Sequence, residues 1–276
     1  MIVDGKLIAA EVEERVRQSL VGATRVPTLA IVVVGKDPVI ESFVRIKKRM
    51  GERLKIVVVE HYFPDTITGE ALKKSIQEIG NSNEIDGVII QLPLPLRVDT
   101  QAMLDAVPTE KDVDMLSRLS VASFARGDAQ VLPPVAGAIQ EILERAKVSV
   151  VGREVLVLGH GRLVGVPASI LMRHNHAHVT VIDREIADLA THVRESDIII
   201  SGVGKPGLIR SEMLQEGAVL IDAGTSESGG KIVGDADSEC ASVASVFTPV
   251  PGGVGPIAVA MIFKNLCILA RHNNIQ

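Results

Sequence analysis

The sequence predicts an α/β protein with two lobes, each built around a parallel sheet. Short runs of β-branched and aliphatic residues alternate along the chain with longer amphipathic segments. These runs are continuously apolar, which is typical of parallel strands whose two faces are both covered by helices. Because the runs form two separate series, we expect two α/β lobes facing each other across a cleft.

The first series predicts three strands with helices between them, and the second predicts four strands in a Rossmann-like lobe. The expected strands are residues 29–35, 55–62 and 87–93, then 154–161, 178–183, 197–204 and 218–224. The expected helices lie around 8–21, 41–54, 69–80 and 100–106, with a connecting helix at 136–147 and a last helix at 256–272. The predicted domains are therefore residues 1–147, completed by 256–276, and residues 148–255.

Composition argues against several classes of protein. The net charge of −5 does not suit a nucleic-acid-binding surface, which is usually basic. Cys240 and Cys267 have no spacing typical of a disulfide framework or a metal site, which favours a reducing compartment. No apolar run approaches the roughly 20 residues of a membrane helix, and the first residues do not resemble a signal peptide. We expect a cytoplasmic protein without nucleic-acid, membrane or metal partners.

A glycine-rich turn predicts nucleotide binding in the second lobe. Gly159, Gly161 and Gly165 follow a strand and lead into a helix, a variant of the dinucleotide fingerprint. Such glycines allow backbone amides to approach a pyrophosphate at a helix N-terminus. The next strand ends at Asp183, 22 residues after Gly161, where an acid can bind a ribose hydroxyl. Arg184 follows and could instead pair with a 2′-phosphate, so these two residues leave the choice between NAD and NADP open.

One lysine lies within the apolar side of a predicted helix. In "ESFVRIKKRMGERL", helical periodicity groups Lys47 with Phe43, Ile46, Met50 and Leu54. Such a lysine must extend its amine to solvent, find a partner or face a pocket, and periodicity alone favours the first outcome. Partial burial would lower its pKa and make it useful as an acid or base.

Two further segments supply polar candidates. Gln91 ends the predicted strand in "DGVIIQLPLP", where its amide can contact either a ligand or the loop backbone. In "EKDVDMLS", one of Asp112 and Asp114 could cap a helix beginning near Met115, which would leave the other carboxylate free for a ligand. The sequence does not choose between these alternatives.

Together these motifs resemble the bifunctional methylenetetrahydrofolate dehydrogenase/cyclohydrolase family. "DGVIIQLPLP" and "TPVPGGVGP" look like its most diagnostic signatures, and "EKDVD", "LVGVP", "IDAGT" and "GDAD" occur in the expected order. The resemblance covers essentially the whole chain. It implies a folate-binding first lobe, a dinucleotide-binding second lobe and a homodimer. The implied reactions of one-carbon metabolism are oxidation of 5,10-methylenetetrahydrofolate with NADP and hydrolysis of the methenyl product to 10-formyltetrahydrofolate, with NAD remaining possible as the cofactor.

The resemblance also implies site residues. Lys47 would be the catalytic lysine, with Gln91 as its hydrogen-bonding companion and Asp114 as the carboxylate that holds the pterin. The stiff "TPVPGGVGP" segment would line the substrate site, where missing side chains allow close approach of a flat pterin. The expected substrate contacts are Phe43, Leu92, Pro93, Pro251, Gly252, Gly253 and Pro256. The expected cofactor contacts are Gly159, His160, Gly161, Arg162, Gly165, Asp183, Arg184, Gly204 and Thr225.

Some positions depart from the family pattern. Phe43 stands where a tyrosine is usual, Gly161 replaces a typical serine, and Asp183 and Arg184 replace a His-Ser or His-Arg pair. These changes spare the implied catalytic residues, so we expect a working dehydrogenase. Hydrolysis depends more on the surroundings of the lysine, which leaves a monofunctional dehydrogenase as an alternative. A non-catalytic regulator that binds folate or nucleotide is a second alternative.

Overall fold

The computed structural model describes residues 1–23, 25–183 and 188–273. The chain divides into two compact units, each formed by two stretches of sequence. The five-stranded unit consists of Met1–Ala10 and Val135–Ala258, and the three-stranded unit consists of Glu11–Pro134 and Val259–Gln276. Each unit contains a parallel sheet with helices, which confirms the predicted α/β class.

The sheet of the three-stranded unit has the order β2-β1-β3, with all strands parallel. Its strands are β1 (Thr28–Val34), β2 (Val57–Phe63) and β3 (Gly87–Ile90). The helices along this part of the chain are α1 (Gly5–Ser19), α2 (Pro38–Leu54), α3 (Gly69–Asn81), α4 (Thr100–Leu104), the 3₁₀ helix η1 (Thr109–Lys111) and α5 (Arg118–Arg126). The sequence analysis considered a helix beginning near Met115, and the structure places the start of α5 three residues later, at Arg118.

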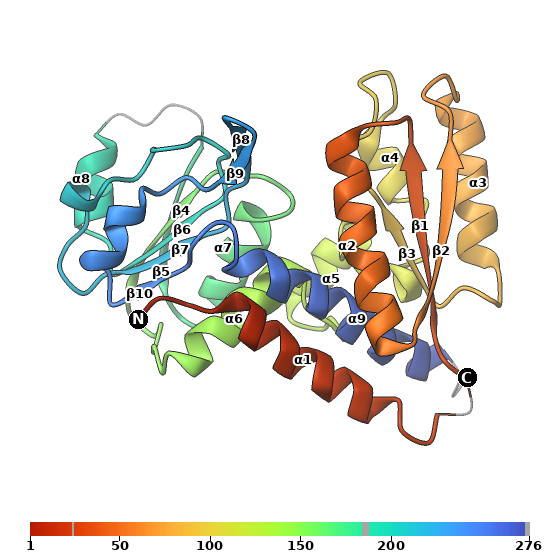
Figure 1. Ribbon diagram of the computed structural model, residues 1–276, viewed down its shortest axis with the longest axis horizontal. Helices are drawn as coiled ribbons and strands as arrows, with labels where there is room; N and C mark the ends of the chain where they lie inside the picture. Colours follow the sequence, from red (N-terminus) through yellow and green to blue (C-terminus); the bar gives the residue numbers. More distant parts are fainter. Residues whose placement is uncertain (24, 184–187, 274–276) are drawn as a thin grey trace. The chain divides into compact units, whose positions relative to one another are not determined.

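Helices cover both faces of this sheet, so the buried strands β1 and β3 are almost wholly apolar, whereas the edge strand β2 contains Glu60, His61 and Tyr62 (Figure 1). Side chains of one face pack with α3 and α4 in an aliphatic core that includes Ala30, Val32, Val88, Leu72 and Ile76. Helix α2 contacts β2, and Figure 1 shows α2 and α3 on opposite sides of the sheet. The continuous apolar runs of the buried strands therefore result from helices on both faces of the sheet, as the sequence analysis inferred.

Local chemistry sets the ends of α2. The Asp37 side chain accepts hydrogen bonds from the amides of Val39 and Ile40, at 2.8 and 3.0 Å, and Pro38 occupies the first helical position. Lys55 adopts a left-handed conformation (φ 58°) and ends the helix. The buried side of α2 comprises Ile40, Val44, Lys47, Met50, Gly51 and Leu54.

Ile46 corrects one part of the predicted pattern. It is 43% exposed, so it does not belong to the apolar side on which the sequence analysis placed it. The buried stripe instead follows an i, i+4, i+7 spacing that begins at Ile40 and passes through Val44 and Lys47. Lys47 therefore lies nearer the centre of the buried stripe than the sequence suggested.

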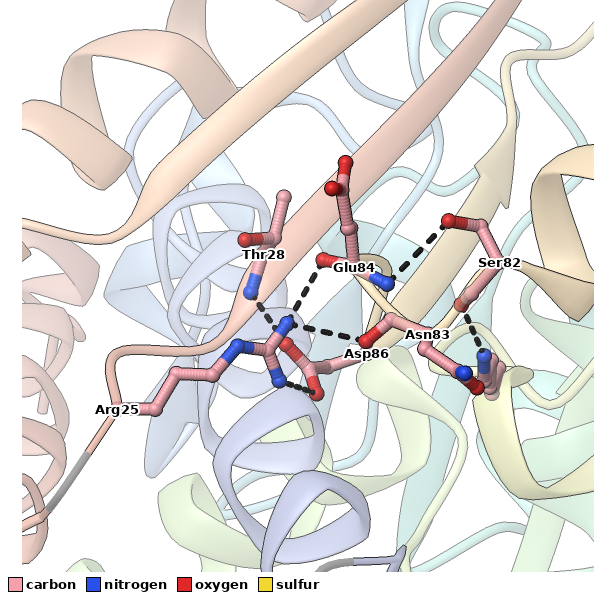
Figure 2. A network of polar contacts seen from close by, with 7 residues as sticks. Arg25, Thr28, Ser82, Asn83, Glu84 and Asp86 are labelled. Atoms are coloured by element: carbon pink, nitrogen blue, oxygen red, sulfur yellow. Dashed lines mark hydrogen bonds and ion pairs between the residues drawn. The ribbon is translucent and has the colours of Figure 1, made fainter.

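A polar network at the amino end of this sheet joins β1 to the segment before β3 (Figure 2). Asp86 is buried, and its carboxylate accepts hydrogen bonds from the amide of Thr28 at 2.7 Å and from the guanidinium of Arg25 at 2.8 Å. Arg25 also donates to the carbonyl of Glu84 at 2.8 Å. These bonds satisfy a buried charge and fix the start of the central strand.

The five-stranded unit has the strand order β10-β7-β6-β4-β5, with all strands parallel. Its strands are β4 (Glu154–Leu158), β5 (His178–Ile182), β6 (Ile198–Ser201), β7 (Val219–Asp222) and β10 (Val246–Phe247). A separate hairpin pairs β8 (Ser226–Ser228) with β9 (Lys231–Val233). The remaining elements are α6 (Pro134–Arg145), α7 (Gly165–His174), α8 (Leu189–Arg194) and the 3₁₀ helices η2 (Ser211–Met213) and η3 (Ser238–Ser242).

The strand order creates a topological switch point in this sheet. From β4 the chain first adds β5 on one side and then returns to add β6 on the other side. The carboxyl ends of β4 and β6 therefore flank the position where ligands bind in open α/β sheets. The sequence analysis found β4 to β7 but missed β8 to β10 and α8, which are all short.

The first residues of the chain pack against "TPVPGGVGP". The amide of Val3 donates to the carbonyl of Phe247, and the amide of Gly5 donates to the carbonyl of Gly252, each at 2.8 Å. Helix α9 (Val254–Asn273) starts inside the segment, so Pro256 lies in its first turn. The helix therefore begins two residues before the predicted start at residue 256. Proline is tolerated there because amides of a first turn lack intrahelical partners.

Helix α9 also corrects the prediction about apolar length. Among the described residues, one helix window, Val254–Arg271, is long and apolar enough by length and composition to cross a membrane. Its mean hydropathy is 1.6, but 61% of the window is buried inside the protein. This is the pattern of a core helix, and the single window is weak evidence for a membrane segment.

Candidate active site

Lys47 lies on the buried side of α2 and is 8% exposed. Its Nζ donates a hydrogen bond to Oε1 of Gln91 at 2.9 Å. Periodicity alone favoured an amine that reaches solvent, and that interpretation is wrong. The family resemblance instead implied a hydrogen bond with Gln91, which is confirmed. The side chain stays inside because a polar acceptor from the neighbouring sheet satisfies it.

Gln91 follows β3 directly and is also 8% exposed. Its backbone amide donates to the carbonyl of Val32 at 2.9 Å, so the residue continues the pairing with β1. Its side-chain Nε2 donates to the carbonyl of Leu92 at 3.0 Å. This second bond holds the amide with its oxygen toward Lys47. Of the two outcomes that the sequence left open for Gln91, the contact with the loop backbone is confirmed, and contact with a ligand stays a prediction.

The two aspartates of "EKDVDMLS" have different roles in the structure. Asp112 is buried, and its carboxylate accepts hydrogen bonds from the amides of Leu116 and Ser117, at 3.3 and 2.9 Å. Neither aspartate caps a helix, because α5 begins at Arg118 and Ser117 is its cap. The Asp114 carboxylate accepts no hydrogen bond from the described residues, so it remains available for a ligand.

Burial and mutual charge set the protonation of Lys47 and Asp114. Burial lowers the pKa of Lys47 from its usual 10.5, while the negative charge of Asp114 opposes that change. Burial raises the pKa of Asp114 to about 6, with Lys47 opposing the shift and Asp112 adding to it. The fraction of Lys47 that is a neutral amine near neutral pH is therefore larger than for an exposed lysine. The Asp114 carboxyl group, whose charge acts on this amine, titrates near pH 6.

Three predicted substrate contacts lie on the same two segments as these polar groups. Phe43 is half-buried on α2, one helical turn before Lys47. Leu92 is half-buried and Pro93 is exposed, and a cis peptide bond joins them immediately after Gln91. The other predicted substrate contacts belong to the five-stranded unit: Pro251, Gly252, Gly253 and Pro256. Their roles stay predictions.

The predicted cofactor residues gather at the carboxyl edge of the five-stranded sheet. They follow four neighbouring parallel strands, whose last residues pair as Ile182 with Leu158, Leu158 with Ser201, and Ser201 with Asp222. After β4 come Gly159, His160, Gly161, Arg162 and Gly165; after β5, Asp183; after β6, Gly204; and after β7, Thr225. This shared edge contains the switch point at which open α/β sheets bind ligands.

The turn after β4 fits an anionic nucleotide. Gly159 has a φ of +90°, and a Cβ atom on Gly165 would lie 1.9 Å from the Gly159 carbonyl oxygen. Around Gly161 there is open space, since a Cβ atom there would meet nothing within 4 Å. Helix α7 starts at Gly165, and its cap residue, Val164, makes no side-chain hydrogen bond to the first amides. A helix N-terminus approached by bare backbone in this way is suited to phosphate oxygens.

Asp183 is exposed directly after β5, and its contact with a ribose hydroxyl stays a prediction. Arg184, the predicted partner of a 2′-phosphate, lies outside the described residues.

The sequence analysis missed a buried acid pair near this edge. Asp222 ends β7 and Asp235 follows β9, and both carboxylates are almost fully buried. Burial raises the pKa of Asp222 to about 6 against the effect of backbone hydrogen bonds, and Asp235 adds to the shift. The motifs "IDAGT" and "GDAD" contain these acids among glycines and apolar residues, which was the available signal.

The fold and the glycine turn define a two-unit α/β protein with a nucleotide-binding domain. Residues 133–274 match the NAD(P)-binding domain of tetrahydrofolate dehydrogenase/cyclohydrolase, and residues 3–114 match the catalytic domain of the same enzymes. The chain therefore belongs to the tetrahydrofolate dehydrogenase/cyclohydrolase family, as the sequence motifs indicated.

Individual relatives agree over nearly the whole chain. The bifunctional protein FolD of Moorella thermoacetica is 39% identical over 276 residues, which cover 98% of this chain and 99% of the relative. The crystal structure of the bifunctional FolD enzyme of Campylobacter jejuni has a TM-score of 0.95 at 28% identity and covers 99% of both chains. The Trypanosoma brucei FolD enzyme, solved with NADP cofactor and inhibitor, has a TM-score of 0.94 at 30% identity and covers 100% of this chain and 99% of that one.

Proposed function

We propose that the protein oxidises 5,10-methylenetetrahydrofolate with NADP and then hydrolyses the methenyl product to 10-formyltetrahydrofolate. Family membership supports both reactions. The observation that carries the proposal is the buried hydrogen bond between Lys47 and Gln91, with the Asp114 carboxylate close by. Burying a lysine costs free energy because its charged form loses water. Ionisable groups with pKa values perturbed in this way gather at functional sites.

The first reaction depends on orientation. When bound, NADP supplies the nicotinamide ring that accepts a hydride from the methylene carbon of the folate. The protein's part is to hold the reacting groups together, which can contribute about 7–11 kcal/mol in favourable systems. We propose that the Gly159–Gly165 turn binds the pyrophosphate and that Asp114 accepts hydrogen bonds from N–H groups of the pterin. The enzyme of Trypanosoma brucei, a structural relative, was solved with NADP, which supports this choice of cofactor over NAD.

The second reaction needs proton transfer, which we assign to Lys47. Loss of the hydride leaves a positively charged methenyl carbon between two folate nitrogens. A neutral Lys47 amine can take a proton from the water that attacks this carbon. The resulting ammonium can return the proton to N5 as the bond between N5 and the carbon breaks. The hydroxyl proton that remains on the adduct is released to solvent in the same step, which leaves a neutral formyl group on N10. Gln91 holds the amine in place through its Oε1, and the lowered pKa of Lys47 keeps the amine from repelling the cation.

A single progress curve tests both halves of this proposal. Methylenetetrahydrofolate would be mixed with NADP, and in a parallel reaction with NAD, while the absorbances of the reduced nicotinamide and the methenyl product are followed together. We expect reduced nicotinamide to accumulate with NADP while the methenyl absorbance rises and then decays. Stable methenyl product would instead indicate a monofunctional dehydrogenase, in agreement with the loss of a tyrosine hydroxyl at Phe43. Binding of both ligands without turnover would indicate a regulator.

We also propose that the protein is a cytoplasmic homodimer formed through the edge strand β2. Among the described residues β2 pairs only with β1, so one row of its backbone groups has no strand partner. Val57 and Tyr62 on this strand are about half exposed, and Nε2 of His61 is buried without a hydrogen-bond partner within the described part of the chain. A second copy of β2 in antiparallel pairing would cover these groups and would give the symmetric contact of a two-fold dimer.

Light scattering after size exclusion tests the dimer. We expect a mass near twice that of one chain, and a Val57→Lys/Tyr62→Lys variant should shift toward one chain at micromolar concentration. Leu119→Lys, a change at an exposed apolar residue of α5, is the matched control and should stay dimeric. A dimer that resists the double change would place the interface elsewhere.

A further inference from the structure

A buried carboxylate organises the carboxyl edge of the five-stranded sheet. Asp235 follows β9 and is fully inaccessible to solvent. A buried carboxylate must be compensated by hydrogen bonds, and Asp235 receives three. Its Oδ2 accepts from Oγ of Ser201 at 2.6 Å and from the amide of Val203 at 2.8 Å, and its Oδ1 accepts from the amide of Lys205 at 2.6 Å.

All three donors belong to one short stretch, which we call the β6 turn (residues 201–205). The stretch includes the last residue of β6 and the turn that follows it. One carboxylate therefore bridges the strand end and two turn amides. Because the two amides bind different oxygens, the carboxylate fixes both the position and the orientation of the turn.

The β6 turn lies directly against the glycine turn after β4. A Cβ atom on Gly159 would lie 3.1 Å from the carbonyl oxygen of Gly202, and a Cβ atom on Gly202 would lie 2.4 Å from the Val164 side chain. These contacts are at the switch point, since β4 and β6 are neighbours in the sheet. A displaced β6 turn would therefore move into the space beside the predicted pyrophosphate site.

Asp222 supports the same arrangement from the next strand. Its carboxylate accepts hydrogen bonds from the amides of Gly224 and Ala236, each at 2.9 Å. The bond to Ala236 fixes the segment that contains Asp235. The backbone of Asp222 is in turn bonded to Oγ1 of Thr248, through its amide at 2.7 Å and its carbonyl at 3.1 Å. The acid pair therefore connects the carboxyl ends of β6 and β7 with the start of "TPVPGGVGP".

We propose that Asp235 is a positioning residue for the dinucleotide: its carboxylate holds the β6 turn in the conformation that receives the nucleotide beside the glycine turn. The inference rests on the proposed function only in taking NADP as the ligand. Asp235 has no access to the ligand itself, so its effect passes through the backbone of the turn.

Asp235→Asn tests this role with little change in volume. An asparagine offers one carbonyl oxygen, and its NH₂ group would face a donor on one side of the turn. We expect the KM for NADP and the calorimetric Kd for NADP to rise about tenfold or more. Hydrolysis of methenyltetrahydrofolate needs no nucleotide, so its kcat should stay within about twofold of wild type and reports that the protein is folded.

Asp237→Asn is the matched control, since Asp237 lies two residues away in the same motif, is exposed and makes no capping bond to η3. Its Kd for NADP should equal that of wild type. If Asp235→Asn does not fold, Ser201→Ala removes one donor and keeps the carboxylate, with an expected rise in Kd of about fivefold.

The outcomes separate the two proposals. A wild-type Kd in Asp235→Asn, or in Ser201→Ala where that variant replaces it, overturns the positioning role and leaves the proposed function intact. If Asp235→Asn loses hydrolysis and nucleotide binding to the same extent, Asp235 stabilises the fold as a whole, and this result would also overturn its positioning role. A wild-type protein that does not bind NADP would overturn the proposed function and this inference together.

Discussion

Replacing Lys47 with methionine is the most informative single change. The substitution keeps an unbranched side chain of similar length on the buried side of α2 and removes the amine. In the structure this amine makes one hydrogen bond, to Oε1 of Gln91. We expect Lys47→Met to abolish hydrolysis without unfolding the protein.

Two opposing effects set the change in stability. The lost bond leaves the buried Gln91 oxygen without its donor, which costs about 1–3 kcal/mol. The lowered pKa of Lys47 shows that the charged amine is unfavourable where it lies, so its removal relieves a desolvation cost. Asp114 loses the charge that opposes the rise of its pKa, but with a pKa already raised to about 6 it can take up a proton instead of remaining an unpaired buried charge. The net change in the free energy of unfolding should therefore be within about 2 kcal/mol of zero. The loss in rate should be far larger, about 10²–10⁴-fold in kcat for hydrolysis, because general acid–base catalysis contributes that much.

Decay of the methenyl absorbance measures hydrolysis, and urea unfolding measures stability. Lys74→Met is the matched control, since Lys74 is an exposed residue of α3. Hydrolysis by Lys47→Met within about threefold of wild type would remove the lysine from the reaction. A loss of several kcal/mol in the free energy of unfolding would show instead that Lys47 is a structural residue.

Four further predictions concern residues other than Lys47. The rate of hydrolysis should fall as the pH drops through about 6, because Asp114 becomes protonated there, and Asp114→Asn should flatten this acidic limb of the pH–rate profile. Since the raised pKa values of Asp114 and Asp222 mean that folding takes up protons between pH 3.8 and about 6, the free energy of unfolding should decrease as the pH rises through that range, and urea titrations of Asp114→Asn should show a smaller slope, with the Asp222 contribution remaining. Gly165→Ala should destabilise the protein by about 1–3 kcal/mol and abolish calorimetric NADP binding, because its Cβ would overlap the Gly159 carbonyl; unchanged affinity would contradict the assigned turn. Asp86→Ala should cost about 2 kcal/mol in urea unfolding with wild-type kcat, because it leaves the amide of Thr28 without its acceptor and breaks a half-exposed pair with Arg25; a change in kcat would contradict a purely structural role.

Strand positions could be predicted from the sequence because apolar runs record burial on both sheet faces. Strands β1 to β7 all lie within or near the predicted ranges. The two-residue strand β10 and the hairpin of β8 and β9 could not be predicted. They lack an apolar run of their own, and β10 forms by pairing with a strand distant in sequence.

Residue patterns alone could not predict the contacts of the site, and the bond between Lys47 and Gln91 was expected only from the family resemblance. Periodicity identified Lys47 as unusual but could not say whether the amine reaches solvent, because the deciding partner, Gln91, is 44 residues away. The choice between Asp112 and Asp114 depended on turn amides that only the folded chain presents. Asp235 was missed for the same reason, since its donors come from the end of another strand.

The most direct test of the account measures the protonation of the Lys47 amine in the folded protein. Heteronuclear NMR of lysine side chains, assigned with Lys47→Met, gives the titration of this single amine. We predict a pKa for Lys47 clearly below the usual 10.5. In Gln91→Met, the ammonium form of Lys47 loses the Oε1 acceptor that stabilises it, so the pKa of Lys47 should fall further. A Lys47 amine that titrates together with the exposed lysines would contradict the proposal that a buried amine transfers protons in this enzyme.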